Sequence, residues 1–224
     1  MFTRRQFLES GVLSLFAVQV ADLAEARSAG GGMIYPGGEV EKVMSTRRTI
    51  RRFSSKGITR EQLMKVLWAS QGITEKQFGF RTAPSAGALY PLEISVFAGP
   101  RSVKELDTGI HRLVPNDLTL ERIAIDDRRK DLASACLGQM WLARAPACLV
   151  ISAAYERTTA KYGKRGVRYA DIESGCAAQN VFLMAVSLGL SAGIVGAFYD
   201  EKVKNLTELK DAEPLLVMPV GYRT

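Results

Sequence analysis

Apolar positions repeat with a helical period in two long segments of the chain. The first covers residues 60–71, where Thr59 and Gln62 form a capping box before the apolar run. The second covers residues 169–188, and Gly189 is placed to end it. Both segments predict helices. The positions expected on the buried side of the second helix are Ile172, Cys176, Ala177, Val181, Met184, Ala185 and Leu188.

Shorter apolar or alternating runs, bounded by turn residues, predict strands. These runs cover residues 94–98, 110–114, 148–153, 192–198 and 215–220. Helices are also predicted near residues 40–47, over 126–140 and in the polar segment between the last two strands. The elements interleave without strict alternation and without the glycine fingerprint of a dinucleotide-binding fold, so the α+β class is favoured.

The first 26 residues have the three parts of a signal peptide. Arg4 and Arg5 supply the charged region, an uncharged run follows, and Ala24-Glu25-Ala26 supplies a cleavage site. The run is too short to span a bilayer. The arginine pair resembles the twin-arginine export signal, which predicts an exported, periplasmic or otherwise extracytoplasmic protein. A permanent membrane anchor and an ordinary amphipathic first helix are the alternatives.

Length and composition predict one globular domain behind this signal. The 224 residues are 47% hydrophobic and 24% charged, which excludes a disordered chain, a collagen-like repeat and a coiled-coil rod. We divide the chain into a signal peptide (1–26), a flexible glycine-rich lead (27–38) and a folded domain (39–224).

The net charge of +7 favours anionic ligands, but the basic residues stand in short scattered groups. No basic face interleaved with aromatic residues is present, so nucleic-acid binding is not expected. Three widely spaced cysteines and a single histidine, His111, do not predict a metal site. We expect at least two buried thiols, a partly exposed His111 and two core tryptophans, Trp68 and Trp141.

The first candidate binding cluster holds four arginines within six residues. Arg47, Arg48, Arg51 and Arg52 surround the hydroxyl of Thr49 and the apolar Ile50. Arginine suits phosphate because its planar fork can bind two oxygens and stays charged at physiological pH. A solvated basic turn is the alternative interpretation.

Two further segments are suited to a flat ligand. In residues 81–93, Pro84 and Pro91 bracket small residues, so the backbone can approach a ring closely while Ser85 supplies a hydroxyl. Residues 193–198 form an apolar run with two glycines. A plain loop and a buried strand end are the respective alternatives.

Taken in order, residues 47–51, 81–93 and 195–198 resemble the nitroreductase-like FMN flavoproteins, and in particular their SagB-type dehydrogenase branch. The resemblance extends from about Met33 to Tyr222. It implies an α+β fold with a central, mostly antiparallel sheet flanked by helices. It also implies a homodimer that binds FMN between its subunits.

The resemblance implies a role for each matching residue. The residues implied to bind the phosphate and ribityl groups are Arg47, Arg48, Thr49 and Arg51, with Arg223 as a further phosphate candidate. Those implied to lie along the isoalloxazine are Pro84, Ser85, Ala86 and Leu89. Those implied to present backbone N–H groups to the N5 edge are Val195, Gly196 and Ala197.

The resemblance also implies the chemistry. Relatives with an open face over the flavin transfer hydride in a ping-pong sequence, and NAD(P)H is a candidate donor. Lys161-Tyr162 is similar to a pair linked to proton removal in azoline-oxidising relatives. Lys161 could act as a base if desolvation or nearby cations favour its neutral form. A solvated lysine beside a surface tyrosine is the alternative.

We therefore predict an exported FMN-dependent oxidoreductase that acts on a small molecule. A flavin-binding module without turnover is the first alternative. An azoline dehydrogenase of a peptide-modifying complex is the second, and the signal peptide argues against it.

Overall fold

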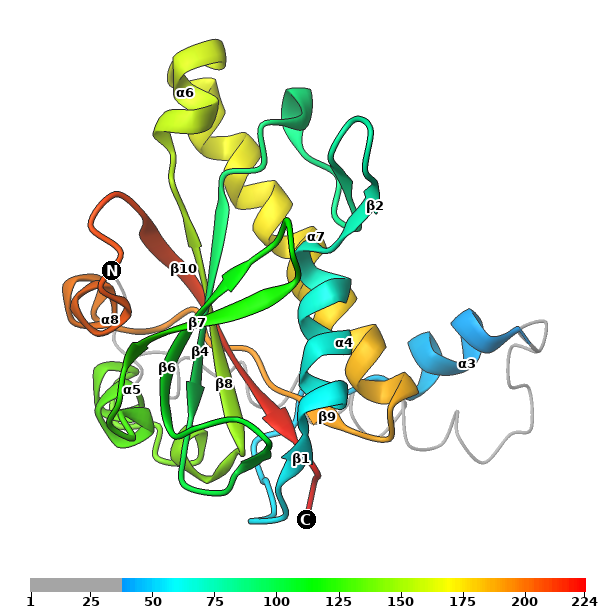
Figure 1. Ribbon diagram of the computed structural model, residues 1–224, viewed down its shortest axis with the longest axis vertical. Helices are drawn as coiled ribbons and strands as arrows, with labels where there is room; N and C mark the ends of the chain where they lie inside the picture. The colour runs from blue at the N-terminus through cyan, green and yellow to red at the C-terminus, as the bar shows by residue number, and fades with distance from the viewer. Residues whose placement is uncertain (1–37) are drawn as a thin grey trace, which may run out of the picture. The chain divides into compact units, whose positions relative to one another are not determined.

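A six-stranded sheet forms the centre of the fold (Figure 1). The computed structural model describes residues 38–224, so the predicted signal peptide and all but the last residue of the predicted lead lie outside the described residues. The strands are β4 (Leu92–Ala98), β6 (Gly109–Val114), β7 (Thr119–Ala124), β8 (Ala147–Ala153), β9 (Ser191–Ala192) and β10 (Glu213–Gly221). Their order is β7-β6-β4-β8-β10-β9, and every neighbouring pair is antiparallel, as predicted.

Helices and short strand pairs complete the described chain. The helices are α3 (Glu39–Thr46), α4 (Arg60–Gln71), α5 (Arg129–Ala135), α6 (Glu156–Tyr162), α7 (Arg165–Ser187) and α8 (Asp200–Thr207), with 3-10 turns η1 (Ala86–Ala88) and η2 (Leu142–Arg144). The short strands are β1 (Ile58–Thr59), β5 (Val103–Lys104), β2 (Ile73–Glu75) and β3 (Phe80–Arg81). Within residues 38–224, none of these helices combines the length and apolar character that a bilayer crossing requires.

The sheet has an apolar core on each face. Successive side chains of a strand point to opposite faces, so Ile94 and Val96 of β4 pack toward α4 and α7, whereas Phe97 packs toward α5 and α8. In β8, Leu149 and Val150 divide in the same way. Burial on both faces explains why these two strands read as mostly apolar runs in the sequence, each with one buried serine, Ser95 or Ser152.

Helix α4 confirms the prediction at both ends. The Thr59 side chain accepts a hydrogen bond from the Gln62 backbone at 3.1 Å, and the Gln62 side chain accepts one from the Thr59 backbone at 3.0 Å. Gly72 follows the last helical residue, and its N–H donates to the carbonyl of Trp68.

Helix α7 is longer than predicted, and its buried side largely matches the predicted one. Ala177, Val181 and Ala185 are buried, and Cys176, Met184 and Leu188 are partly buried against the same core. The helix begins at Arg165, and its buried residues follow the spacing of Ala170, Ala177 and Ala185. Ile172 was expected to be buried but is 55% exposed. It lies two positions beyond Ala170, which turns its side chain about 200° away from the core.

Two predicted elements are much shorter in the structure. The helix expected over 126–140 is limited to α5, because Leu137 and Gly138 adopt left-handed φ angles of 56° and 73° and break the helix. The strand expected over 192–198 is limited to β9 and one isolated bridge between Val195 and Val217. Gly193 and Val195 still form backbone hydrogen bonds with β10, and the pairing ends after Val195.

Candidate functional site

The arginine cluster and the glycine-containing segment lie side by side. Ile50 donates its N–H to the carbonyl of Ala192 at 2.9 Å, and Thr49 forms a parallel bridge with the same residue. Gly193 is required at this contact, because a Cβ there would lie 2.6 Å from the backbone oxygen of Ile50. Two segments separated by more than a hundred residues in the sequence are therefore joined through their backbones.

The arginines of this cluster have different surroundings. The Arg47 guanidinium lies 5.0 Å from the ring centroid of Phe182, and Arg48 donates to the carbonyl oxygens of Ser45 and Arg47. Arg51 is exposed and forms no ion pair within residues 38–224. The cluster thus offers an exposed guanidinium at Arg51 and a half-buried one at Arg47.

Arg223 joins the same region from the other end of the chain. It pairs with Phe53 in an antiparallel bridge, and the N–H of Thr224 donates to the carbonyl of Arg52. The Arg223 side chain is exposed. A further cation therefore lies next to the arginine segment in space.

The backbone at Gly196 and Ala197 is open. Val195 exchanges two backbone hydrogen bonds with Val217, at 2.8 and 2.9 Å, and the two following residues are exposed. A Cβ built on Gly196 would meet no atom within 4 Å. We call residues 47–51, residues 193–197 and Arg223 the basic half-site.

The proline-bracketed loop has an unusual backbone. Gly87, Ala88 and Tyr90 have φ angles of 62°, 54° and 47°, in the left-handed region. Left-handed φ at a non-glycine residue costs roughly 1–2 kcal/mol and persists only where surrounding contacts impose it. Five other non-glycine residues between 38 and 224 share this conformation, so the backbone of Ala88 and Tyr90 marks the loop as a candidate only together with its contacts.

Tyr90 supplies the contacts that hold the loop. Its N–H donates to the Ser85 hydroxyl at 2.9 Å, and its own hydroxyl accepts from the backbone N–H of Arg81 at 3.1 Å. The Arg81 guanidinium lies 4.7 Å from the centroid of its ring. The carbonyl oxygen of Tyr90 accepts a hydrogen bond from Arg157 at 3.0 Å, and Arg157 also forms an ion pair with Glu93.

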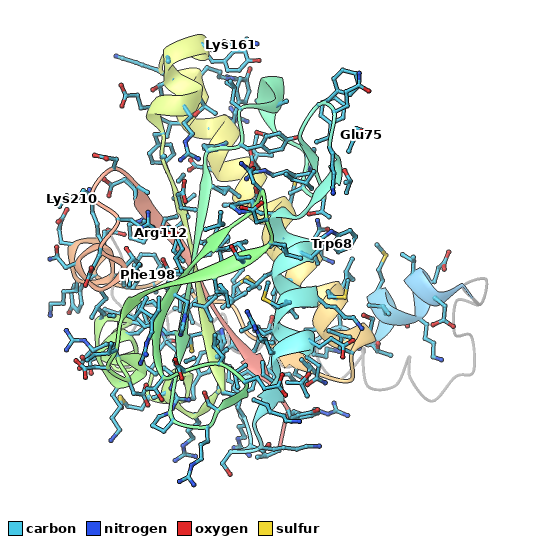
Figure 2. All side chains as sticks on the ribbon, in the orientation of Figure 1. Trp68, Glu75, Arg112, Lys161, Phe198 and Lys210 are labelled. Carbon is cyan, nitrogen blue, oxygen red and sulfur yellow. The ribbon has the colours of Figure 1, made fainter. Side chains whose placement is uncertain are left out.

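Lys161 and Tyr162 lie against this loop. A Cβ built on Gly87 would lie 2.6 Å from the Tyr162 hydroxyl and 3.0 Å from the Lys161 Nζ. Tyr162 packs edge-on against Tyr169 of α7, with ring centroids 5.2 Å apart. The exposed Lys161 projects at the end of the molecule that carries α6 (Figure 2). We call residues 81–91 with Lys161 and Tyr162 the loop half-site.

A buried polar cluster beneath the loop was missed in the sequence. Glu173 of α7 is 2% exposed, and burial raises the pKa of its carboxyl group, which the nearby Ser85, Gln71 and Arg81 only partly oppose. Arg81 donates to Gln71 at 2.8 Å, and burial lowers the pKa of its guanidinium. The available signal was a single acidic residue on the alanine-lined side of a long helix.

One chain does not bring the two half-sites together. Ser85 of the loop half-site lies beside Glu173, whereas Arg47 of the basic half-site lies beside Phe182. Nine residues of α7 separate these positions, which is two and a half turns, so they lie on opposite sides of the helix. Along the axis the loop half-site extends further, because the carbonyl of Thr82 accepts a hydrogen bond from Asn180 at 3.2 Å. Figure 1 shows α7 running from the α6 end to the β9 end.

Several residues outside the half-sites also differ from expectation. His111 was expected to be partly exposed, but it is buried on β6 and its Nε2 lies 2.9 Å from the carbonyl oxygen of Asp107. Burial lowers its pKa. Trp68 was expected in the core but is 39% exposed, because it lies on the outer side of α4. Two buried thiols, Cys136 and Cys148, confirm the cysteine prediction.

Sequence comparison identifies the family. A model of the nitroreductase family matches residues 44–222. The Methanocaldococcus jannaschii protein MJ1384, named as a nitroreductase, is 44% identical over 185 residues, which cover 83% of this chain and 91% of that protein. The Escherichia coli microcin B17-processing protein McbC is 28% identical over 146 residues, covering 63% of this chain and 54% of McbC. The chain belongs to the nitroreductase family, whose members are generally FMN-dependent oxidoreductases.

Solved structures share the architecture. A Ralstonia eutropha protein, named as a nitroreductase, has a TM-score of 0.73 at 25% identity and covers 85% of this chain and 86% of its own. The NADPH:FMN oxidoreductase of Vibrio harveyi, solved with NAD+, has a TM-score of 0.60 at 20% identity, covering 83% and 69%. These likenesses confirm the predicted nitroreductase-like α+β fold.

The contact between Gly87 and the Lys161-Tyr162 pair can be tested with two matched glycines. Gly87→Ala and Gly79→Ala place a Cβ on backbones with φ of 62° and 67°, so we expect both to lose about 1–2 kcal/mol of stability in urea unfolding. The Cβ at Gly79 meets no atom within 4 Å, whereas that at Gly87 displaces Tyr162 and Lys161. Flavin-linked activity should therefore fall in Gly87→Ala only, and equal activities would contradict the contact.

Proposed function

We propose that this protein is an exported FMN-dependent oxidoreductase that acts on a small molecule. The observation that carries the proposal is the pair of half-sites: a cationic segment beside open backbone, and a strained loop in contact with Lys161 and Tyr162. The first suits a phosphate and the edge of a flat ring, and the second suits the face of that ring. Membership of the nitroreductase family supports FMN as the ligand.

The residues present fit FMN in their chemistry. Arg51 and Arg223 present guanidinium groups at the surface, and Thr49 adds a hydroxyl beside them. We assign the phosphate and ribityl groups to these residues together with Arg47 and Arg48. Open backbone at Gly196 allows a ring edge to approach the N–H groups of Gly196 and Ala197. The N–H of Val195, which was also expected to face the ring, is instead donated to the carbonyl of Val217.

The loop half-site would lie along the ring through Pro84, Ser85, Ala86 and Leu89. FMN bound here would supply hydride transfer between a donor such as NAD(P)H and an acceptor in a ping-pong sequence. We propose that Lys161 takes a proton from the substrate and that the Tyr162 hydroxyl orients the substrate for this step. Lys161 is exposed in one chain, so its desolvation would come from ligand or from a second chain.

We also propose a homodimer whose two FMN sites each take one half-site from each subunit. The half-sites lie on opposite sides of α7, so one flavin would not reach both within a chain. Exposed apolar side chains on α7 and α4 offer a contact surface, with Ile172 55%, Val167 39% and Trp68 39% exposed. A twofold pair repeats each composite site.

The likeness to McbC favours one second candidate. An azoline dehydrogenase that processes a peptide would use the same flavin and the Lys161-Tyr162 pair, which contacts the loop half-site. The chain would then oxidise an azoline peptide substrate in the presence of its partner proteins and leave NAD(P)H unused. A flavin-binding module without turnover would accept electrons from neither source under anaerobic conditions.

Affinity for FMN tests the basic half-site. Removing two charged hydrogen-bond donors, each contributing about 1.5–3 kcal/mol, should weaken binding on the order of 100-fold or more in Arg47→Ala/Arg51→Ala. Fluorescence titration with FMN measures this change. The matched control is Lys130→Ala/Lys210→Ala, which removes two exposed cations elsewhere and should bind normally. Unchanged affinity in the arginine variant would remove this cluster from the site.

Mixing two inactive variants tests the composite site. Arg47→Ala/Arg51→Ala damages only the basic half-site, and Lys161→Ala/Tyr162→Phe damages only the loop half-site. After dissociation and reassociation of a mixture, some dimers carry one site without either change, so activity should return. If activity does not return although mixed dimers are detected by mass, each site is formed within one chain.

Export is tested at the arginine pair. Receptors of the twin-arginine route read the two arginines rather than their charge alone, so Arg4→Lys/Arg5→Lys should hold the protein in the cytoplasm. Fractionation of cells that express the full chain measures its location. Export of the double variant at the normal rate would show that a different route, or none of this type, is used.

A further inference from the structure

Glu173 carries a buried carboxyl group that lacks a hydrogen-bond partner within the described residues. It is 2% exposed, and neither carboxylate oxygen makes a hydrogen bond of normal geometry within the described residues. Burying an ionised carboxylate without partners is strongly unfavourable, so such a group is either neutral or held by nearby donors. Its surroundings therefore decide its role.

Three elements contribute the groups that face it. The Gln71 amide comes from the end of α4, the Arg81 guanidinium from β3 and the Ser85 hydroxyl from the loop half-site. Arg81 is the only charged group among them, and it is shared, because Nη1 donates to Gln71 and the ring of Tyr90 lies against the guanidinium. Glu93 and Arg157 act on Arg81 rather than on Glu173 directly.

Ser85 has one proton to donate and two directions in which to donate it. Its oxygen already accepts from the N–H of Tyr90 at 2.9 Å. A serine hydroxyl has a single O–H donor, so that proton points either inward to Glu173 or outward to a ligand on the loop. The choice depends on whether the inner carboxyl group offers a free acceptor.

We propose that Glu173 is a positioning residue that sets the direction in which the Ser85 hydroxyl donates, and thereby the affinity of the loop half-site for FMN. Ionised Glu173 is only an acceptor, so it draws the Ser85 proton inward and removes a donor from the flavin face. Protonated Glu173 competes for that proton less, and Ser85 then donates outward. This inference rests on the proposed function and deepens it.

The sign of the pH dependence follows from this geometry. Burial raises the pKa of Glu173, so the carboxyl group stays protonated above the usual range of glutamate. FMN binding should be tighter below that pKa and weaken about two- to tenfold as pH rises through it, the effect of one hydrogen bond. The stability of the flavin-free protein should fall as pH rises from the ordinary glutamate pKa to this raised pKa, because only the unfolded state ionises in that interval.

Four forms of the full chain separate this role from a merely structural one: wild type, Glu173→Gln, Ser85→Ala and the double variant. The dissociation constant of FMN is measured for each by fluorescence from mildly acidic to mildly alkaline pH. Thermal midpoints without FMN are measured over the same range. Arg168→Gln, an exposed charge change on the same helix, is the matched control and should show the pH dependence of wild type.

We expect both single variants to lose the pH dependence of FMN binding, and the double variant to equal Ser85→Ala. Glu173→Gln should also remove the loss of thermal stability at higher pH. If Ser85→Ala keeps the wild-type pH dependence, Glu173 acts through its charge alone and the proposal is overturned. If wild type binds no FMN at any pH, the proposed function itself fails, which is a separate result.

Discussion

The burial of α7 between α4 and the sheet is the constraint on which both half-sites depend. Alanines at helical spacing face the core and let the helix approach β4 and β8 closely. Tyr169 then holds Tyr162 near the start of the helix, and Phe182 lies beneath Arg47 near its end. Because one packed helix holds both Tyr162 and Arg47 in place, the half-sites stay at a constant separation. Neither half-site can shift without disturbing the core.

The loop half-site combines backbone strain with a buried polar cluster, and the two are connected. Gly87, Ala88 and Tyr90 hold left-handed φ angles that are unfavourable by themselves. Tyr90 offsets this strain through its backbone contacts with Ser85 and Arg157. Ser85, which these bonds help to fix, also lies beside Glu173, whereas Pro84, Gly87 and Ala88 of the same loop are exposed.

The sequence was sufficient where the controlling interactions are local. The capping box at Thr59 predicted the start of α4 and the apolar repeat its extent. Mostly apolar runs predicted β4 and β8 because those strands are buried on both faces. It was insufficient where a distant element decides. The burial of His111 depends on the layer that covers β6, and the close contact of Gly193 with the Ile50 backbone joins segments more than a hundred residues apart.

For the candidate site, too, local features could be predicted from the sequence and long-range placement could not. The arginine segment and the proline-bracketed loop were recognisable from composition, but their placement on opposite sides of α7 was not, because it follows from helix phase and packing. In the proposed homodimer, FMN would bridge two chains and bind only the associated state. Binding of that kind stabilises association by mass action. Cofactor loading and dimer assembly would then be coupled, and a chain without FMN would leave Arg51 and Ser85 without a shared ligand.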